Sequence, residues 1–282
     1  MRMIGVIYMA FLEAALRILH IEMETPTSYG WFHIVWLVIS AACTVLAWIY
    51  GPKASEKQVR SIVFITGLVV FLLEIYKQIV YTFIPDDNGI SASYQWYAFP
   101  FQFCSTPMYA GLLAGISRKG RFHRAICAYL ATYAVFAGIA VMLYPVTVFT
   151  FTAGINIQTM ICHGSMIPIG ALLFSSGYIK PRFRTFLRAL LVFICAVFIA
   201  VILNEIAYFS GLLETHNFNM FFISPHCDPS LPVYSLVQQY VPFPWCLSIY
   251  ILGFSAAAFT ILLIFRCMLQ KKQSLHRQLI DK

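Results

Sequence analysis

The sequence lacks the charge of a soluble protein. Only 11% of its 282 residues are Asp, Glu, Lys or Arg, and 60% are hydrophobic, whereas soluble domains average about 25% charged residues. The mean hydropathy is +0.78. A soluble fold of this composition would have too little polar surface to cover its core, so the composition indicates a polytopic membrane protein.

Seven apolar segments are each near the ~20 residues that a helix needs to cross a bilayer. They lie at about 31–50, 61–83, 95–116, 124–146, 157–177, 186–209 and 246–266. We therefore predict an all-α polytopic membrane helix bundle of about seven transmembrane helices, with a transmembrane domain over residues 29–268. An amino-terminal apolar or amphipathic segment precedes it at 1–28, and a basic tail follows at 269–282. Glu13 and Arg17 are spaced to pair along one helix, so this first segment is predicted to be a retained interfacial or additional helix.

Lysine and arginine are absent from the second, fourth and sixth connections between these segments. They gather in the first, third and fifth connections, just inside the sixth span, and in the tail: Lys53, Lys57, Arg60, Arg118, Lys119, Arg121, Arg124, Lys180, Arg182, Arg184, Arg188, Arg266, Lys271, Lys272, Arg277 and Lys282. By the positive-inside rule, this alternation predicts a multi-pass cell-membrane protein with a cytoplasmic carboxyl terminus. The net charge of +8 then follows from topology, with anionic headgroups as contacts, and no nucleic-acid partner is predicted.

The eight cysteines show no C-x-x-C pair and no Cys/His spacing of a zinc site. The sequence therefore predicts no metal and no cofactor. Most of the cysteines lie in apolar segments, where a cysteine is usually a small buried hydrophobe. Cys227 and Cys246 fall in or beside one outer loop, and a disulfide between them is left open because sequence does not supply the geometry.

Polar residues recur at one depth, about a third of the way from the outer face. They are His33, Glu74, Lys77, Gln102, Cys104, His163, Asn204 and Glu205, from five of the predicted spans. Ionisable groups inside a membrane are energetically costly, so their presence there favours a functional role. Pro107 and Pro168 follow Cys104 and His163 and predict helix breaks beside both, the second freeing the Gly164 carbonyl.

Each of these residues also has a plain structural interpretation. Glu74 and Lys77 are spaced i, i+3 and can neutralise each other. A single cysteine or histidine in a helix is more often a packing residue than a catalyst, and His33 and Glu205 can extend to the membrane interface. The shared depth is what favours a functional site.

A thiol needs help to become a nucleophile, because its pKa of about 8.5 rises in apolar surroundings unless a base or a positive charge is near. His163 can be that base, with Glu74 or Glu205 orienting the imidazole. Asn204, Gln102 or Lys77 can donate to a developing oxyanion. At the depth of lipid ester bonds, a Cys/His pair indicates acyl transfer through a thioester.

Several short motifs, in order along the chain, resemble a known family. Those in the first three spans are similar to motifs of the YwaF-like integral membrane proteins, which group with transmembrane protein 164: Trp31-Phe-His33, Glu74-Ile-Tyr-Lys77 and Phe99-Pro-Phe-Gln-Phe-Cys-Ser105. Later motifs fit the same pattern: Cys162-His163-Gly164, Asn217-Phe-Asn219-Met-Phe-Phe222 and Pro242-Phe-Pro-Trp245. The similarity covers about residues 28 to 268.

The resemblance implies a multi-span fold and, from the animal relatives, a cysteine-centred acyltransferase that acts on glycerophospholipids, including ether lipids. It assigns Cys104 as the nucleophile and His163 as its partner, and it places Asn217 and Asn219 in a loop motif. The chain departs from the pattern at Gln102, where many bacterial members have a histidine two residues before the cysteine.

Three hypotheses follow. The first is a cysteine-dependent acyltransferase or acyl hydrolase whose substrates are membrane lipids. The second is a proton-coupled transporter or small-molecule receptor, with its site formed by Glu74, Lys77, His163 and Glu205. The third is a structural or assembly-partner protein in which the polar layer serves helix packing.

Overall fold

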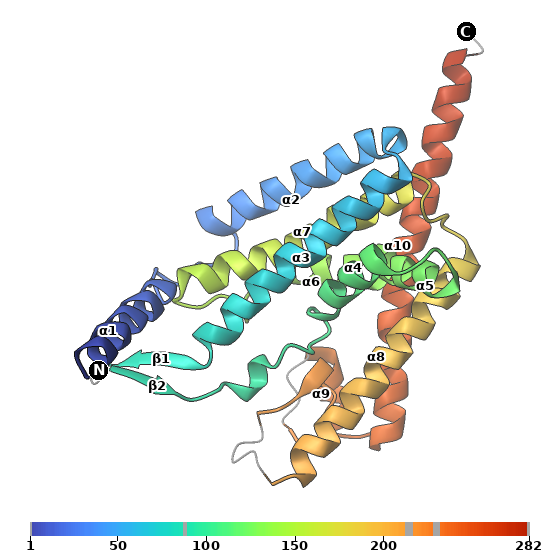
Figure 1. Ribbon diagram of the computed structural model, residues 1–282. Helices are drawn as coiled ribbons and strands as arrows, with labels where there is room; N and C mark the ends of the chain where they lie inside the picture. The colour runs from blue at the N-terminus through green and yellow to red at the C-terminus, as the bar shows by residue number, and fades with distance from the viewer. Residues whose placement is uncertain (1, 87–88, 212–216, 228–231, 281–282) are drawn as a thin grey trace.

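The computed structural model describes residues 2–86, 89–211, 217–227 and 232–280, and it is an all-α helix bundle with one short hairpin (Figure 1). The fold class that the sequence predicts is thus confirmed. The elements in order are α1 Arg2–Leu19, α2 Trp31–Tyr50, η1 Gly51–Lys53, α3 Glu56–Val80, β1 Phe83–Asp86, β2 Gly89–Ala92, η2 Trp96–Ala98, α4 Thr106–Ile116, α5 Arg121–Tyr129, the π-helical η3 Leu130–Ala134, α6 Val135–Leu143, α7 Ala153–Ser175, α8 Phe183–Phe209, η4 Met220–Phe222, α9 Pro232–Gln238 and α10 Phe243–Ile280.

Six helical segments in the described part of the chain are long and apolar enough to cross a membrane: α2, α3, the continuous α5–η3–α6, α7, α8 and α10. The sequence predicts a seventh transmembrane helix over about 95–116, with a break beside Cys104 and Pro107, and the structure corrects the extent of the helical part. Residues 99–105 contain no regular helix, and only α4, which is 11 residues long, follows them.

Proline chemistry explains the break. Phe99 precedes Pro100 and has an extended backbone, with φ −48° and ψ 134°, because the proline ring disfavours helical geometry in the residue before it. Pro107 lies in the first turn of α4, where its missing N–H removes no intrahelical bond. It therefore opens a helix and does not interrupt one.

The connections gather at two ends of the bundle. At the first end, Lys119 forms an ion pair with Glu56, and Lys272 donates to the Trp48 carbonyl at 3.3 Å. These contacts bring the α2–α3 connection, the α4–α5 connection and the last turns of α10 together, and we call this the basic end. At the opposite end, Tyr29 before α2 donates to the Leu143 carbonyl that ends α6, at 2.6 Å. The segment 95–116 therefore still passes from one end to the other, partly as non-helical chain.

α7 lies at the centre of the bundle, packed against α2, α3 and α6 (Figure 1). Pro168 lies inside it and cannot donate to the Gly164 carbonyl four residues back. That carbonyl accepts a hydrogen bond from the Ser40 hydroxyl of α2 at 2.9 Å. A neighbouring helix thus satisfies the backbone group that the proline frees, as membrane interiors require.

α3 and α4 approach each other through glycines. A Cβ atom on Gly67 would lie 2.9 Å from the Leu112 backbone nitrogen, and one on Gly111 would lie 3.1 Å from the Gly67 Cα. Two glycines, Gly67 and Gly111, therefore let the backbones of α3 and α4 touch. This contact fixes the start of α4 against α3.

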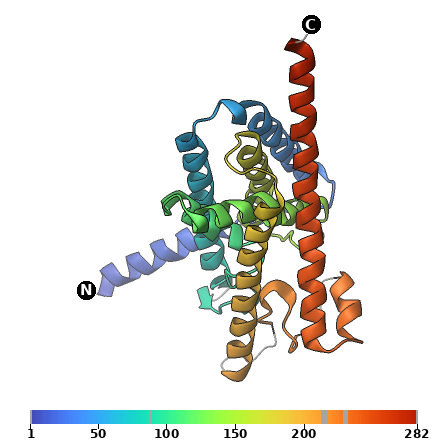
Figure 2. The same cartoon turned by 90° about the vertical axis from the view of Figure 1, so that its right-hand side faces the viewer.

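The amino-terminal segment forms α1, which projects from the side of the bundle in both ribbon views (Figures 1 and 2). Arg17 pairs with Glu13 at 2.9 Å, as their spacing predicts, and also donates to the Asp86 carbonyl of the β1–β2 hairpin at 2.9 Å. The carboxyl-terminal segment is not a separate tail in this structure, since α10 continues without a break to Ile280 and extends beyond the other helices.

Candidate functional site

Cys104 lies in the non-helical stretch directly before Ser105, the residue that caps α4. Its side chain is half-buried. The chain turns here because Ser105 donates its N–H to the Gln102 carbonyl at 2.9 Å and the Thr106 hydroxyl donates to the Phe103 carbonyl at 2.7 Å. Two prolines and these local bonds place the thiol on irregular backbone inside a helical bundle. Such backbone at membrane depth occurs only where it is buried in protein or lines a water-filled cavity.

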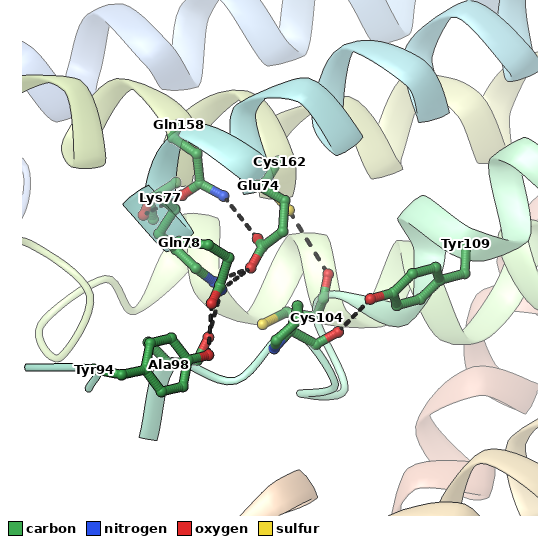
Figure 3. Close-up of polar contacts among 11 residues, drawn as sticks. Glu74, Lys77, Gln78, Tyr94, Ala98, Cys104, Tyr109, Gln158 and Cys162 are labelled. Atoms are coloured by element: carbon green, nitrogen blue, oxygen red, sulfur yellow. Dashed lines mark hydrogen bonds and ion pairs between the residues drawn. The ribbon is translucent and has the colours of Figure 1, made fainter. Parts of the chain in front are cut away.

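A buried polar cluster lies beside this stretch (Figure 3). Glu74 Oε1 accepts from Lys77 Nζ and from Gln78 Nε2, both at 2.7 Å, and Gln158 Nε2 lies 3.4 Å from Glu74 Oε2. Gln78 also donates to the Ala98 carbonyl at 2.8 Å. One carboxylate on α3 is therefore held by its own helix and by α7.

Tyr94 completes the cluster, because its hydroxyl donates to Gln78 Oε1 at 2.6 Å. Burial, together with the negative charge of Glu74, raises the pKa of Tyr94 to about 12. The phenol is thus protonated at neutral pH and acts as a donor. Its bond fixes the orientation of the Gln78 amide.

The Glu74–Lys77 pair lies near the Cys104 stretch (Figure 3). Cys162 of α7 lies close by, with its Sγ 3.7 Å from the Cys104 carbonyl oxygen, and Tyr109 donates to the Pro100 carbonyl at 2.8 Å (Figure 3). A cavity of about 270 Å³ borders the cluster and is lined by Glu74, Gln78, Pro100, Met108, Tyr109, three further residues of α3, Thr82, and Phe83 of β1.

His163 is buried in α7, and its two ring nitrogens differ. Nδ1 lies 2.8 Å from the Thr159 carbonyl oxygen, and because a carbonyl only accepts, Nδ1 carries the proton. Nε2 is buried and has no hydrogen-bond partner. The imidazole thus presents an unused lone pair. No hydrogen bond joins it to Cys104 in the described structure, and the pairing of the two residues stays a prediction.

Gln102 and Asn204 hold the loop that follows α8. Gln102 Nε2 donates to the Asn219 carbonyl at 3.0 Å and its Oε1 accepts from the Phe221 N–H at 2.9 Å. Asn204 bonds the Met220 carbonyl and N–H in the same way, at 3.1 and 2.7 Å. Both amides therefore have their oxygen and one N–H occupied by loop backbone, and the role of either as an oxyanion donor stays a prediction.

The loop motif that the resemblance marks is part of this arrangement. Asn219 accepts from the Ser224 N–H at 2.9 Å, whereas Asn217 is exposed. Phe221 and Phe222 have left-handed backbones, with φ of 59° and 57°, which is strained for residues other than glycine. Phe221 is fully buried against Phe103. The amide clamps thus hold a strained loop over the Cys104 stretch.

His33 and Glu205 lie in separate contacts. His33 accepts from the Tyr29 N–H at 2.9 Å and donates to the Met142 carbonyl at 2.9 Å, which ties α2 to the end of α6. Glu205 pairs with His226 at 3.1 Å, and the His226 ring stacks on Tyr208. Cys227 and Cys246 donate to the carbonyls of Phe218 and Val241, so no disulfide joins these two described residues.

The structure thus brings together Glu74, Lys77 and the Cys104 stretch. It adds Gln158 and Tyr94, which the sequence analysis did not predict as site residues. Gln158 lies one helical turn before Cys162 on the same face of α7. That spacing is the sequence signal from which Gln158 could have been predicted as a site residue. Among the described residues, no group of three or more His, Cys, Asp or Glu side chains gathers to hold a metal ion.

These features define an all-α, multi-pass membrane protein with a buried polar cluster beside a cysteine on irregular backbone. A family model described as the TMEM164 family matches residues 28–266, and the chain belongs to this family. No curated protein and no solved structure matches the chain. The additional relation to YwaF-like proteins stays a prediction.

Proposed function

We propose that this protein is a membrane-embedded, cysteine-dependent acyltransferase that acts on phospholipid acyl chains, with Cys104 as the nucleophile. The observation that carries the proposal is the position of Cys104, on non-helical chain beside a buried ion pair and a cavity of about 270 Å³. The other cysteines of the described structure that lie inside helices lack this combination.

The reaction would run in two steps. The Cys104 sulfur attacks an ester carbonyl carbon, a carbon–sulfur bond forms, and the ester carbon–oxygen bond breaks. The departing lysophospholipid oxygen takes up the proton that the thiol lost. A hydroxyl of a second lysophospholipid then attacks the thioester, its proton goes to the base, and the thiol is restored.

His163 is the base in this proposal, because its Nε2 lone pair is buried and unused. The Lys77 charge favours the thiolate, and Glu74 holds Lys77 in place at 2.7 Å. Catalytic hydrogen bonds are often long before substrate binds and tighten in the complex. The proposed Cys104–His163 bond would therefore form when the lipid substrate binds.

The test is transfer of labelled acyl chains in vesicles that contain the purified protein. We expect Cys104→Ala to abolish both transfer and the hydroxylamine-sensitive acyl label on the protein. Cys195→Ala is the matched control, since this cysteine is exposed on α8, and it should retain full transfer. Transfer that persists without Cys104 would refute the mechanism.

A second candidate is a proton-coupled transporter or small-molecule receptor. The observation that favours it is the Glu74–Lys77 pair itself, in which Glu74 is buried and lines the cavity, since intramembrane ion pairs often mark solute paths. Solute or proton flux that depends on Glu74 and survives Cys104→Ala would support this candidate over acyl transfer.

A further inference from the structure

Two groups of cations at the basic end differ in their partners. Several cations have hydrogen-bond or ion-pair partners within the chain. Arg60 donates to the carbonyls of Gly115 and Ser117 at 2.7 and 2.6 Å. Lys119 pairs with Glu56, and Lys272 donates to the Trp48 carbonyl and lies 5.4 Å over its ring. These cations stabilise connections between helices.

Four arginines form the second group: Arg121 and Arg124 in the first turn of α5, and Arg184 and Arg188 in the first two turns of α8. α5 and α8 pack against each other, and both begin at the basic end, so their first two turns carry the four arginines to the same end of the bundle. None of the four forms an ion pair with an acidic side chain in the described structure.

The surroundings add positive charge to this group. Both helices begin here, and neither has an acidic residue in its first turn, although helix amino ends favour anions through their free N–H groups and their dipoles. The chain has no Asp or Glu at all between Asp87 and Glu205. Four guanidinium groups and two positive helix ends thus lie at the basic end. The chain from α4 to Asn204 of α8 supplies no acidic side chain that could balance them.

The positive-inside rule accounts for cations at this end but not for their arrangement, since scattered lysines would satisfy it equally well. Guanidinium groups bind phosphate with two parallel hydrogen bonds, which an ammonium group does not do. Basic recesses between helices at a membrane surface are known headgroup sites. We propose that Arg121, Arg124, Arg184 and Arg188 bind the phosphate of an anionic phospholipid headgroup between the amino ends of α5 and α8.

This site is separate from Cys104 and does not depend on the proposed acyl transfer. The 11 residues of α4 lie between the two, a length of about 16 Å at the helical rise. A lipid bound there would be a lasting partner of the bundle and not the acyl substrate.

The test measures how strongly spin-labelled phosphatidylglycerol is immobilised by the full chain in phosphatidylcholine vesicles, relative to spin-labelled phosphatidylcholine. Arg124→Gln with Arg188→Gln should lower this preference by about fivefold per arginine, or roughly 25-fold in all. Lys119→Gln with Lys272→Gln removes the same charge at the same end and should change it less than about twofold, because both lysines already have partners.

A second variant keeps the charge, and therefore the topology, and changes only the shape of the donor. Arg124→Lys with Arg188→Lys should lose at least about threefold of the preference, since lysine cannot form the paired bonds. An equal loss of phosphatidylglycerol preference in the arginine-to-glutamine and the lysine-to-glutamine variants would overturn the site in favour of a diffuse surface charge. No loss of preference in the arginine-to-lysine variant would overturn it in the same way. Release of the immobilised lipid by inorganic pyrophosphate at constant ionic strength would overturn it in favour of a soluble phosphate ligand.

Discussion

At the residue scale, the buried Glu74–Lys77 pair is the feature with the largest energetic consequence. Side-chain exposure is 6% for Glu74 and 15% for Lys77, so neither charge is solvated well. The carboxylate is supported by amides of Gln78 and Gln158. A buried charge that loses its partner costs far more than the pair contributes as a whole.

We expect Glu74→Gln to lower the free energy of unfolding by about 3 kcal/mol, because the Lys77 ammonium is left buried and uncompensated. The double variant Glu74→Gln with Lys77→Met should recover most of this loss. Chemical unfolding in mixed micelles provides the measurement.

Glu13→Gln is the control, because its pair with Arg17 is exposed and should be worth less than about 1 kcal/mol. A loss at Glu74 no larger than that at Glu13 would mean that water or lipid headgroups reach the pair.

The sequence predicts local pairs well and distant ones poorly. The i, i+3 spacing of Glu74 and Lys77 predicts their contact directly, as the i, i+4 spacing does for Glu13 and Arg17. The bonds from Gln158 and Tyr94 to the same cluster depend on how α7 and the residues after β2 pack on α3. Periodicity within one helix carries no information about such contacts.

At the element scale, the glycine contact between α3 and α4 positions the Cys104 stretch. Gly67 and Gly111 touch backbone to backbone, so neither neighbour can move aside as a flexible side chain would. α4 begins two residues after Cys104. A shift of α4 along α3 would therefore move the thiol relative to Glu74 and Lys77.

We predict that Gly67→Ala lowers the free energy of unfolding by about 1–3 kcal/mol, the usual cost of overpacking. Gly253→Ala in α10 is the control, because a Cβ there meets no atom within 4 Å, and alanine should be neutral or stabilising by up to about 1 kcal/mol. Parallel unfolding curves of the two variants test the prediction, and equal stabilities would contradict a tight α3–α4 contact.

The same scale shows where sequence reasoning about helices fails. Hydropathy over 95–116 resembles a span, yet Pro100 and Pro107 divide the segment into irregular chain and a short helix. Pro168 lies in a segment of similar hydropathy and leaves α7 continuous, because Ser40 satisfies the carbonyl that it frees. The outcome depends on whether a neighbouring helix offers a donor, and this is a tertiary property.

At the scale of the whole molecule, seven passes alternate between the two ends, and the basic connections collect at one of them. Arg60, Lys119 and Lys272 join three separate connections there. The β1–β2 hairpin and the loop after α8 are not among these contacts; the hairpin instead meets α1 through Arg17. This segregation is what the loop charges predict, and it supports the proposal that the basic end is cytoplasmic.

Labelling with a membrane-impermeant maleimide tests this orientation in a chain whose native cysteines are replaced by serine. Ser91→Cys lies on the exposed hairpin strand β2 and Ser274→Cys on the exposed last turns of α10. We expect Ser91→Cys to react in intact cells and Ser274→Cys to react only after the cells are opened. Reaction of Ser274→Cys in intact cells would reverse the assignment, and it would place the four unpaired arginines on the outer leaflet, where anionic phospholipids are scarce. The orientation of the bundle thus decides whether the proposed headgroup site faces a membrane surface that can supply its ligand.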